Sequence, residues 1–406
     1  MDNEMVTTMG NDYVMNTYRR LPMGIARGKG STVWDCDGNA YLDLVAGIAV
    51  NNVGHCHPAV VKTIQEQSEQ LIHCSNLYWN EPQVQLAKLL TEVSCADKVF
   101  FCNSGAEANE GALKLARKWA SKRGETHRTQ IITALNSFHG RTMGALSATG
   151  QTQYQQGFGP LVPDIIHVAF NDLAALAAAV GPNTAAVLLE TVQGEGGVLP
   201  MTPEYMAGVA ALREDFGFLL MIDEVQTGLG RTGKLFGHEH FTVKPDVFTL
   251  AKGLGGGMPI GALAARGAAA EVLQPGEHAS TFGGNPLAAA TALATLTVIL
   301  EENLSRAAQE KGEYIKTKIS RWKHLKDVIV EVRGQGLMIG IELACSGKPV
   351  VEYCLEHRVL INCIHDQVLR LVPPLVISYE EIEKALAVIK EALEAQQNKG
   401  GEGIGS

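Results

Sequence analysis

The stretch Asp246-Val-Phe-Thr-Leu-Ala-Lys-Gly-Leu-Gly-Gly-Gly-Met-Pro259 joins an apolar run to a glycine-rich turn, and Lys252 stands where the two meet. The apolar run predicts a buried strand that carries an ammonium group to its carboxyl end. Burial lowers the pKa of a lysine and frees its amine to act as a nucleophile or base, and such lysines often serve in Schiff-base chemistry. A solvated surface charge is the ordinary alternative for any lysine. The sequence around the stretch decides between a catalytic Lys252 and a surface one.

An alternation of strands and helices surrounds this stretch. Seven apolar runs predict strands at 98–102, 130–134, 165–169, 185–190, 216–222, 246–250 and 260–265. Helical patterns fall between several of them, at 106–121, 173–180 and 203–215. Most of the runs are continuous rather than alternating, which is typical of strands covered on both faces. The sequence therefore predicts an α/β fold around a mainly parallel, seven-stranded sheet, with ligands beyond the carboxyl ends of the strands.

The pattern divides the chain into four parts. Residues 1–50 form an irregular N-terminal segment that we expect to pack with a small domain, and residues 51–295 form a large domain that binds the ligand. A long helical stretch runs from 286 to about 323, and short apolar runs with few helical patterns follow it. This change of pattern predicts a smaller α+β domain at 296–397. Residues 398–406 have the composition of turns, and we expect a disordered tail there.

Composition argues against several classes of function. Lys and Arg number 34 against 43 Asp and Glu, a formal net charge of −9, which disfavours nucleic acid as a partner. No apolar run approaches the roughly 20 residues of a membrane span, and the N-terminus lacks the pattern of a signal peptide. The eight cysteines form no Cys-x-x-Cys pair and are typical of the reduced thiols of a cytoplasmic protein. The one Cys/His cluster, Gly54-His-Cys-His-Pro58, predicts a structural turn rather than a metal site.

Several strand ends carry residues suited to a ligand. Ser104-Gly105-Ala106 lies at the turn into a helix, where free N–H groups and the helix dipole favour a phosphate, although an ordinary helix cap is the alternative. Phe138 and His139 offer flat faces for an aromatic ring, and Arg141 offers a fork for a carboxylate, unless they are packed loop residues. Glu195 belongs either to a solvated loop or to a pair with an arginine.

Asp223 follows four apolar residues, so its carboxylate is predicted to be buried and to need a cation or several hydrogen-bond donors. The alternatives are a strand-end aspartate that caps a turn, or a Mg²⁺ ligand of a nucleotide-hydrolysing site. The second alternative needs a phosphate loop of the form Gly-x-x-x-x-Gly-Lys-[Ser/Thr], and the sequence has none. A phosphate cradle, an aromatic face, a buried carboxylate and Lys252 thus converge on one sheet edge. Pyridoxal phosphate is one ligand that satisfies all four.

Specific motifs extend this prediction along the chain. They are Gly54-His-Cys-His-Pro58, Asn103-Ser-Gly-Ala-Glu-Ala-Asn109, Phe138-His-Gly-Arg141, Gln193-Gly-Glu-Gly-Gly197, Asp223-Glu-Val-Gln226, the Lys252 stretch and Ser280-Thr-Phe-Gly-Gly-Asn-Pro286. With them, the sequence from about Arg27 to about Ser378 resembles the class III (ornithine-type) aminotransferases of the fold-type I pyridoxal phosphate family. The resemblance implies that fold, that cofactor and a ping-pong aminotransferase reaction.

The resemblance also implies roles at the cofactor. Lys252 would form the Schiff base with the cofactor aldehyde, and Asp223 would hold the pyridine nitrogen protonated. Gln226 would bond the ring hydroxyl oxygen, and Phe138 would cover the ring. Residues 104–106 would bind the phosphate, Gly105 and Ala106 through their backbone N–H groups and Ser104 beside them.

Two arginines at different distances are implied for two different substrates. Arg141 would take the distal carboxylate of an ω-amino donor, and Arg370 would take the α-carboxylate of glutamate. Glu195 would pair with Arg370 when no α-carboxylate is present. This pair argues against a racemase, decarboxylase or aminomutase on the same fold, because a glutamate half-reaction is what requires it. The intact set of Lys252 and Asp223 likewise argues against a non-catalytic binding protein.

Residues from other parts of the chain are expected to complete the site. Thr281 would reach the phosphate from the neighbouring subunit, which makes the sites composite and the homodimer obligatory. Ser280 and Tyr18 would lie on the substrate side. Where ornithine aminotransferases carry a tyrosine that holds free ornithine, this sequence has Ile48, which suits an acylated amine. N2-acetylornithine is therefore the favoured donor, with N-succinylornithine, succinyl-diaminopimelate, ornithine and 4-aminobutyrate left as alternatives.

Overall fold

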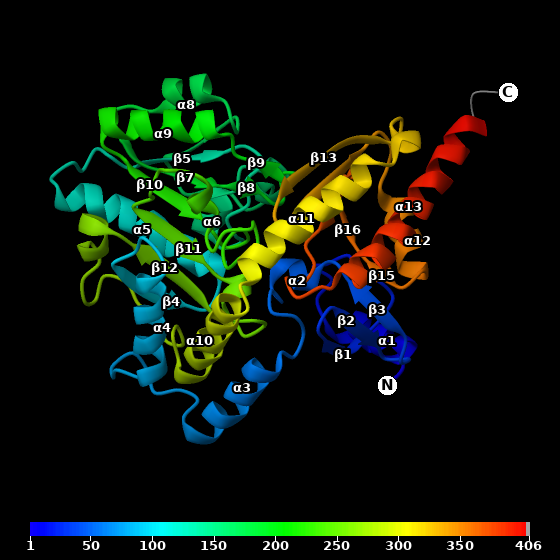
Figure 1. The fold of residues 1–406 in the computed structure, drawn as a ribbon. Helices are drawn as coiled ribbons and strands as arrows, with labels where there is room; N and C mark the ends of the chain where they lie inside the picture. Colours follow the sequence, from blue (N-terminus) through cyan, green and yellow to red (C-terminus); the bar gives the residue numbers. More distant parts are fainter. Residues whose placement is uncertain (403–406) are drawn as a thin grey trace.

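The structure, a computed structural model, describes the backbone of residues 1–402 and the side chains of residues 1–397. A seven-stranded sheet with the order β4-β12-β11-β10-β7-β5-β6 forms its larger half (Figure 1). The strands are β4 Lys98–Cys102, β5 Gln130–Ala134, β6 Ile165–Val168, β7 Thr184–Glu190, β10 Leu219–Asp223, β11 Val247–Leu250 and β12 Gly261–Ala265. Neighbouring strands are parallel except at β12, which runs antiparallel to β11 and β4. The predicted α/β fold with a mainly parallel seven-stranded sheet is confirmed.

Helices cover both faces of this sheet, which explains its continuous apolar strands. Every residue of β7 and β10 is buried. Along β10, Ile222 packs in the cluster that contains Val209 of α9 (Pro203–Phe216), whereas Met221 packs with Leu115 of α5 (Gly105–Lys122). Because successive side chains of a strand point to opposite faces, α9 and α5 lie on opposite sides. The polar residues that end these strands therefore emerge only at the edge of the sheet.

Two expected boundaries were wrong, each because one residue adopts a left-handed conformation. Gly217, at φ +66°, ends α9, so β10 begins at Leu219 rather than at 216 and extends to Asp223. Asn303, at φ +51°, breaks the expected long helix into α10 (Pro286–Glu301) and α11 (Leu304–Ser320). Glycine and asparagine tolerate this conformation better than other residues.

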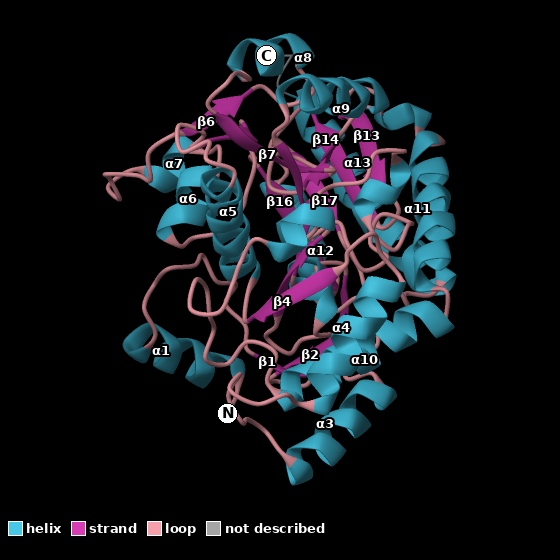
Figure 2. Cartoon of the chain, turned by 90° about the vertical axis from the view of Figure 1, so that its left-hand side faces the viewer, coloured by secondary structure: helices cyan, strands magenta, loops and turns pink. Residues whose placement is uncertain are grey.

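A second, smaller sheet lies toward the C-terminus. It has the order β13-β14-β17-β16, with β13 Ile329–Gln335, β14 Met338–Leu343, β16 Asn362–Ile364 and β17 Val368–Leu371. The helices around it are α11, α12 (Lys348–Glu356) and α13 (Tyr379–Glu402). Figure 2 shows α10 and α11 following one another along one side of the molecule. Arg370 lies in β17 of this sheet, so the second sheet contributes to the region where the large one ends.

The N-terminal segment shares a third sheet with the C-terminal part of the chain. Strand β15 (Val359–Leu360) pairs in parallel with β3 (Ala40–Asp43), next to β2 (Thr32–Asp35) and β1 (Ile25–Lys29). The boundaries expected at residues 50, 295 and 397 stay a prediction. Helix α13 continues to Glu402, beyond its expected end at 397, and the last part of the expected tail, residues 403–406, lies outside the described residues.

Short elements connect these sheets. They are α1 Asn3–Tyr13, α2 Ala46–Ala49, α3 Pro58–Gln70, α4 Glu81–Glu92, α6 Met143–Ala148, α7 Thr152–Gln155, α8 Leu173–Ala179, β8 Val192–Gln193, β9 Leu199–Pro200 and the 3₁₀ turns η1 Gly237–His240, η2 Lys252–Leu254, η3 Gly267–Glu271 and η4 Lys323–Leu325.

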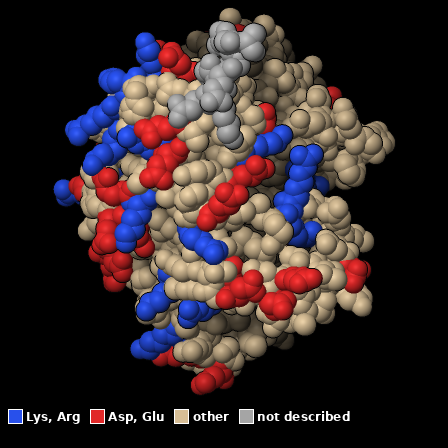
Figure 3. All heavy atoms as spheres, turned by 90° about the vertical axis from the view of Figure 1, so that its right-hand side faces the viewer, with Lys and Arg blue, Asp and Glu red and all other residues tan. Residues whose placement is uncertain are grey.

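Within residues 1–402, no single helix is long and apolar enough to cross a membrane. Helices α10 and α11 together have the required length and apolar composition, but a bend of 61° separates them. On the face shown in Figure 3, basic and acidic side chains are interspersed. All eight cysteines are free thiols.

Candidate active site

A cavity of about 400 Å³ opens at the carboxyl edge of the large sheet. The loops after β4, β5, β7, β10 and β11 supply most of its wall, as expected for a ligand site of a parallel sheet. Its lining residues are Val50, Asn103, Ser104, Gly105, Ala106, Asn109, Phe138, His139, Gly140, Arg141, Glu190, Glu195, Asp223, Val225, Gln226, Ala251, Lys252, Gly257, Met258, Pro259 and Ile260. The structure thus brings together most of the residues that the sequence selects.

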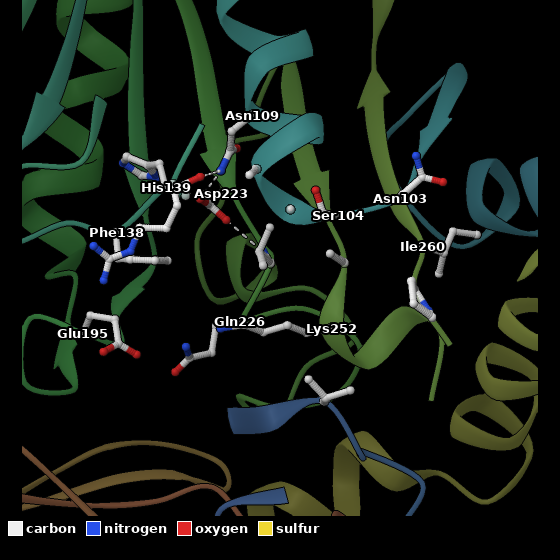
Figure 4. Close-up of a pocket in the computed structure, with 18 of the residues that line it drawn as sticks. Asn103, Ser104, Asn109, Phe138, His139, Glu195, Asp223, Gln226, Lys252 and Ile260 are labelled. Carbon is white, nitrogen blue, oxygen red and sulfur yellow. Dashed lines mark hydrogen bonds and ion pairs between the residues drawn. The ribbon is translucent and has the colours of Figure 1, made fainter. Parts of the chain in front are cut away.

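Lys252 faces this cavity from the end of β11 (Figure 4). Burial lowers the pKa of its ammonium group to about 8, with opposing contributions from the charges of Glu195 and Arg370. The uncharged amine is therefore much more accessible near neutral pH than that of an ordinary lysine. Lys252 also has a φ of +40°, a left-handed conformation that costs a non-glycine residue roughly 1–2 kcal/mol. Strain of this kind collects at functional sites.

Asp223 ends β10 and is almost fully buried, and two other segments, α5 and the loop after β5, hold its carboxylate together with the backbone just after β10 (Figure 4). Its Oδ2 accepts a hydrogen bond from Asn109 Nδ2 at 2.7 Å and lies 2.8 Å from His139 Nδ1. Its Oδ1 accepts from the backbone N–H of Val225 at 2.9 Å. Thr249 Oγ1 in β11 donates in turn to Asn109 Oδ1 at 2.8 Å. The carboxylate is fixed at the cavity wall as an oriented negative charge.

Sequence reasoning missed three members of this wall. Asn109 belongs to the motif Asn103–Asn109, but the sequence predicted no role for it. His139 was expected to stack on an aromatic ring, not to bond Asp223. Glu190 ends β7 and accepts a hydrogen bond from the backbone N–H of Phe138 at 3.2 Å. Burial and then the neighbouring charge of Asp223 raise the pKa of Glu190 well above its ordinary value, which favours the uncharged form of this side chain. The sequence shows only that Glu190 ends a predicted strand, and the structure places it opposite Asp223 on the adjacent strand.

The N-terminus of α5 forms one end of the cavity. Ser104 caps the helix, and its Oγ accepts from the backbone N–H of Glu107 at 3.2 Å. The N–H groups of Gly105 and Ala106 are the first of the helix and have no acceptor inside it. A Cβ on Gly105 would come within 2.8 Å of Val225, so glycine lets these two segments approach closely. The result is an open set of donors at the positive end of an 18-residue helix, which suits a phosphate.

Two arginines mark the substrate side of the cavity. Arg141 lines it directly, with its guanidinium 3.8 Å from the centre of the Tyr154 ring and 5.3 Å from that of Phe138. Arg370 is buried and lies 2.5 Å from Glu195, which lines the cavity. Burial alone would raise the pKa of Glu195, but Arg370 lowers it. The contact with Arg370 therefore favours the charged form of Glu195.

Three expected site residues do not reach the cavity of their own chain. Tyr18 is 71% exposed and stacks with Arg20. Ser280 Oγ accepts a hydrogen bond from Asn103 Nδ2 at 3.2 Å, so it touches the cavity wall from outside. Thr281 is exposed beside it.

Comparisons with known proteins assign the chain to a family. The sequence pattern described as Aminotransferase class-III matches residues 13–393. The chain belongs to the class III aminotransferases. It is 52% identical to the acetylornithine aminotransferase of Caldanaerobacter subterraneus subsp. tengcongensis, over 95% of this chain and 98% of that one. It is 49% identical to the acetylornithine aminotransferase of Methanothermobacter thermautotrophicus, over 96% and 98%.

Solved structures agree with this assignment. The ornithine aminotransferase of Toxoplasma gondii superposes with a TM-score of 0.95 at 36% identity, over 98% of this chain and 96% of that one. The acetylornithine aminotransferase of Elizabethkingia anophelis superposes with a TM-score of 0.87 at 32% identity, over 97% and 100%. This class III aminotransferase therefore has the fold-type I architecture and depends on pyridoxal phosphate.

The cavity of this aminotransferase fits that cofactor. Gln226 Oε1 is buried at the cavity wall and has no hydrogen-bond partner among the described residues. A buried polar atom in that state is costly unless a ligand satisfies it. The free N–H groups at Gly105 and Ala106, the carboxylate of Asp223 and the amine of Lys252 complement a phosphate, a protonated ring nitrogen and an aldehyde.

Proposed function

We propose that the chain transfers the terminal amino group of N2-acetylornithine to 2-oxoglutarate, giving N-acetylglutamate 5-semialdehyde and glutamate. The observation that carries the proposal is the presence of two arginine positions at one cavity, Arg141 on its lining and Arg370 behind Glu195. One site must accept a donor whose carboxylate is far from the reacting amine and an acceptor whose carboxylate is adjacent to the reacting carbon. The names of the relatives at 46–52% identity support the choice of donor.

The two arginines divide the recognition of the two substrates. We infer that Arg141 binds the distal carboxylate of the donor, and that Glu195 neutralises Arg370 while this donor is bound. When glutamate or 2-oxoglutarate binds, its α-carboxylate replaces Glu195 as the partner of Arg370. A buried arginine left without any partner would cost about 3–5 kcal/mol, so the exchange of partners keeps both complexes accessible.

The proposed mechanism assigns the proton transfers to Lys252. Its lowered pKa makes the amine available both to hold the cofactor covalently and to accept the proton from the substrate carbon that bears the amine. When bound, pyridoxal phosphate supplies an electron sink for the charge that develops on that carbon. Asp223, fixed by Asn109 and His139, holds a proton at the ring nitrogen. Gln226 would bond the ring hydroxyl group, and residues 104–106 would hold the phosphate.

Ile48 supports an acylated donor. It is 42% exposed and stands at φ +63°, an uncommon conformation for a β-branched residue. Val50, two residues later, lines the cavity, and we infer that Ile48 lies beside the bound donor. An aliphatic side chain in that place gives no hydrogen-bond partner to a free, charged α-amine but tolerates an acetyl group. N-succinylornithine, ornithine and 4-aminobutyrate are the alternative donors of the same family.

We also propose a homodimer with composite sites, located in the cytoplasm. Thr281 and Ser280 adjoin a surface on which Trp79 is 89%, Leu77 84% and Phe282 59% exposed. Large exposed apolar side chains grouped in this way mark interaction sites. A second copy would cover them and receive Thr281 at its phosphate site. The free thiols of all eight cysteines support the proposed location.

A panel of half-reactions tests the donor. Among the ω-amino donors, N2-acetylornithine should change the cofactor absorbance of the holoenzyme fastest, and N-succinylornithine, ornithine and 4-aminobutyrate should change it more slowly. Glutamate, the substrate of the other half-reaction, should also change it rapidly. Stopped-flow spectra give each rate without a second substrate. Faster reaction with ornithine or 4-aminobutyrate than with either acylated donor would refute the proposed substrate.

Replacing Glu195 with Gln tests the exchange of partners. Glu195→Gln should raise the ratio of kcat/KM for glutamate to kcat/KM for N2-acetylornithine by about tenfold or more, because in the variant only glutamate gives Arg370 a charged partner. The glutamate half-reaction is the internal control. Equal losses in both half-reactions would contradict the exchange.

Replacing Trp79 with Glu tests the second copy. Because Trp79 is 89% exposed in the single chain, Trp79→Glu harms the protein only if another chain covers it. We expect light scattering to give twice the chain mass for the wild type and the mass of one chain for Trp79→Glu. Val330→Glu is the control, because Val330 is 63% exposed in the C-terminal sheet, and it should keep twice the chain mass. A wild-type particle of single-chain mass would rule out the composite site.

A further inference from the structure

A second cluster of reactive groups lies behind the cavity wall. Cys95, in the loop between α4 and β4, has its Sγ 3.7 Å from His238 Nε2 in η1. The other ring nitrogen, His238 Nδ1, lies 3.0 Å from Glu224 Oε1, directly after β10. None of the three residues lines the cavity, although Glu224 stands between Asp223 and Val225, which do. Thiol, imidazole and carboxylate are thus aligned in the order that activates a cysteine nucleophile.

Glu224 is the fixed anion of this cluster. It is fully buried, and it accepts hydrogen bonds from Thr227 Oγ1 at 2.6 Å, from Gly237 N at 2.9 Å and from His238 N at 2.7 Å. Burial alone would raise the pKa of Glu224, but the bonds and charge of His238, with those of Thr227 and Gly237, lower it. A charged carboxylate with this many donors orients the imidazole ring and favours its protonated form.

His238 is the cation between the two. Its side chain is almost fully buried, stacked on Phe236 at 5.6 Å between ring centres and tilted against Phe248 at 5.3 Å. Burial lowers the pKa of His238, but the contacts with Cys95 and Glu224 outweigh it and raise the pKa to about 10. The two phenylalanines carry no charge, so Glu224 and Cys95 are the ionisable groups in contact with the ring.

We propose that Cys95 is a reactive thiolate, paired with the imidazolium of His238, and that it forms mixed disulfides with low-molecular-weight disulfides such as glutathione disulfide. Cys95 is partly exposed, although it also packs against the apolar core. Its surroundings differ from those of three other cysteines. Cys102 and Cys354 are buried in apolar surroundings that raise the pKa of each thiol to about 12. Cys345 is exposed, and partial burial raises its pKa without a cationic partner.

The reaction is a thiol–disulfide exchange. The Cys95 sulfur attacks one sulfur of the disulfide, a new S–S bond forms to that sulfur, and the other half leaves as a thiolate that takes a proton from water. Cys95 is oxidised and the leaving half is reduced, so no further oxidant is needed. This site is independent of the transamination chemistry and goes beyond the proposed function.

The pH dependence of alkylation tests the pairing in the holoenzyme. Iodoacetamide should modify Cys95 at a rate that changes by less than about threefold between pH 6 and 8.5, because a thiolate paired with imidazolium stays deprotonated. The rate at Cys345, in the same molecule, should rise about tenfold per pH unit. Mass spectrometry of the tryptic peptides gives both rates from one sample. At pH 6.5, glutathione disulfide should modify Cys95 before Cys345, and dithiothreitol should reverse it.

Two variants separate this role from simple packing. In His238→Gln, the Cys95 rate should fall by about tenfold at pH 6.5 and acquire the pH dependence of Cys345. Cys95→Ser should lose the modification and retain transamination. Two results in the wild type would overturn the proposal, so it stays testable even if His238→Gln does not fold. One is a Cys95 rate that rises with pH in parallel with the Cys345 rate, and the other is a Cys95 that stays unmodified while Cys345 reacts.

Discussion

The buried carboxylate of Asp223 is the constraint on which the site depends. A charge withdrawn from water is tolerated only when donors or a cation replace the lost hydration. Here Asn109, His139 and the N–H of Val225 provide the donors, and Thr249 orients Asn109 in turn. These bonds hold helix α5, the loop after β5 and strands β10 and β11 in one arrangement. The phosphate end of the cavity and the position of Lys252 follow from that arrangement, because α5 and β11 carry them.

Charges on the two sides of the cavity differ in how firmly they are fixed. Around Asp223 the partners are hydrogen-bonding groups of helix α5 and of the loops at the edge of the large sheet. Arg370 lies in the smaller sheet and donates to Asn362 there, but its charged partner is one carboxylate, Glu195, which lines the cavity. The first arrangement suits a cofactor that stays in place. The second suits a site whose two substrates must displace one another.

The sequence was sufficient to predict the sheet and its principal site residues, since continuous apolar runs end directly in Asp223 and just before Lys252. It was insufficient for Asn109, His139 and Glu190, because their roles arise from contacts between segments far apart in the chain, 114 residues in the case of Asn109 and Asp223. Helix ends also depended on single left-handed residues, Gly217 and Asn303, which the apolar pattern does not reveal. Tyr18 and Thr281 were expected at the active site, but neither lies at the cavity of its own chain.

The central claim is that Lys252 both holds the cofactor and moves the proton. Its most direct test is the first half-reaction of Lys252→Ala, with Lys348→Ala, a lysine on the surface, as control. The account predicts a native circular dichroism spectrum, no cofactor retained on the chain after borohydride reduction, and a half-reaction at least about 10²–10⁴-fold slower than in the control. A Lys252→Ala protein that keeps borohydride-fixed cofactor, or that reacts at a rate close to that of Lys348→Ala, would contradict it.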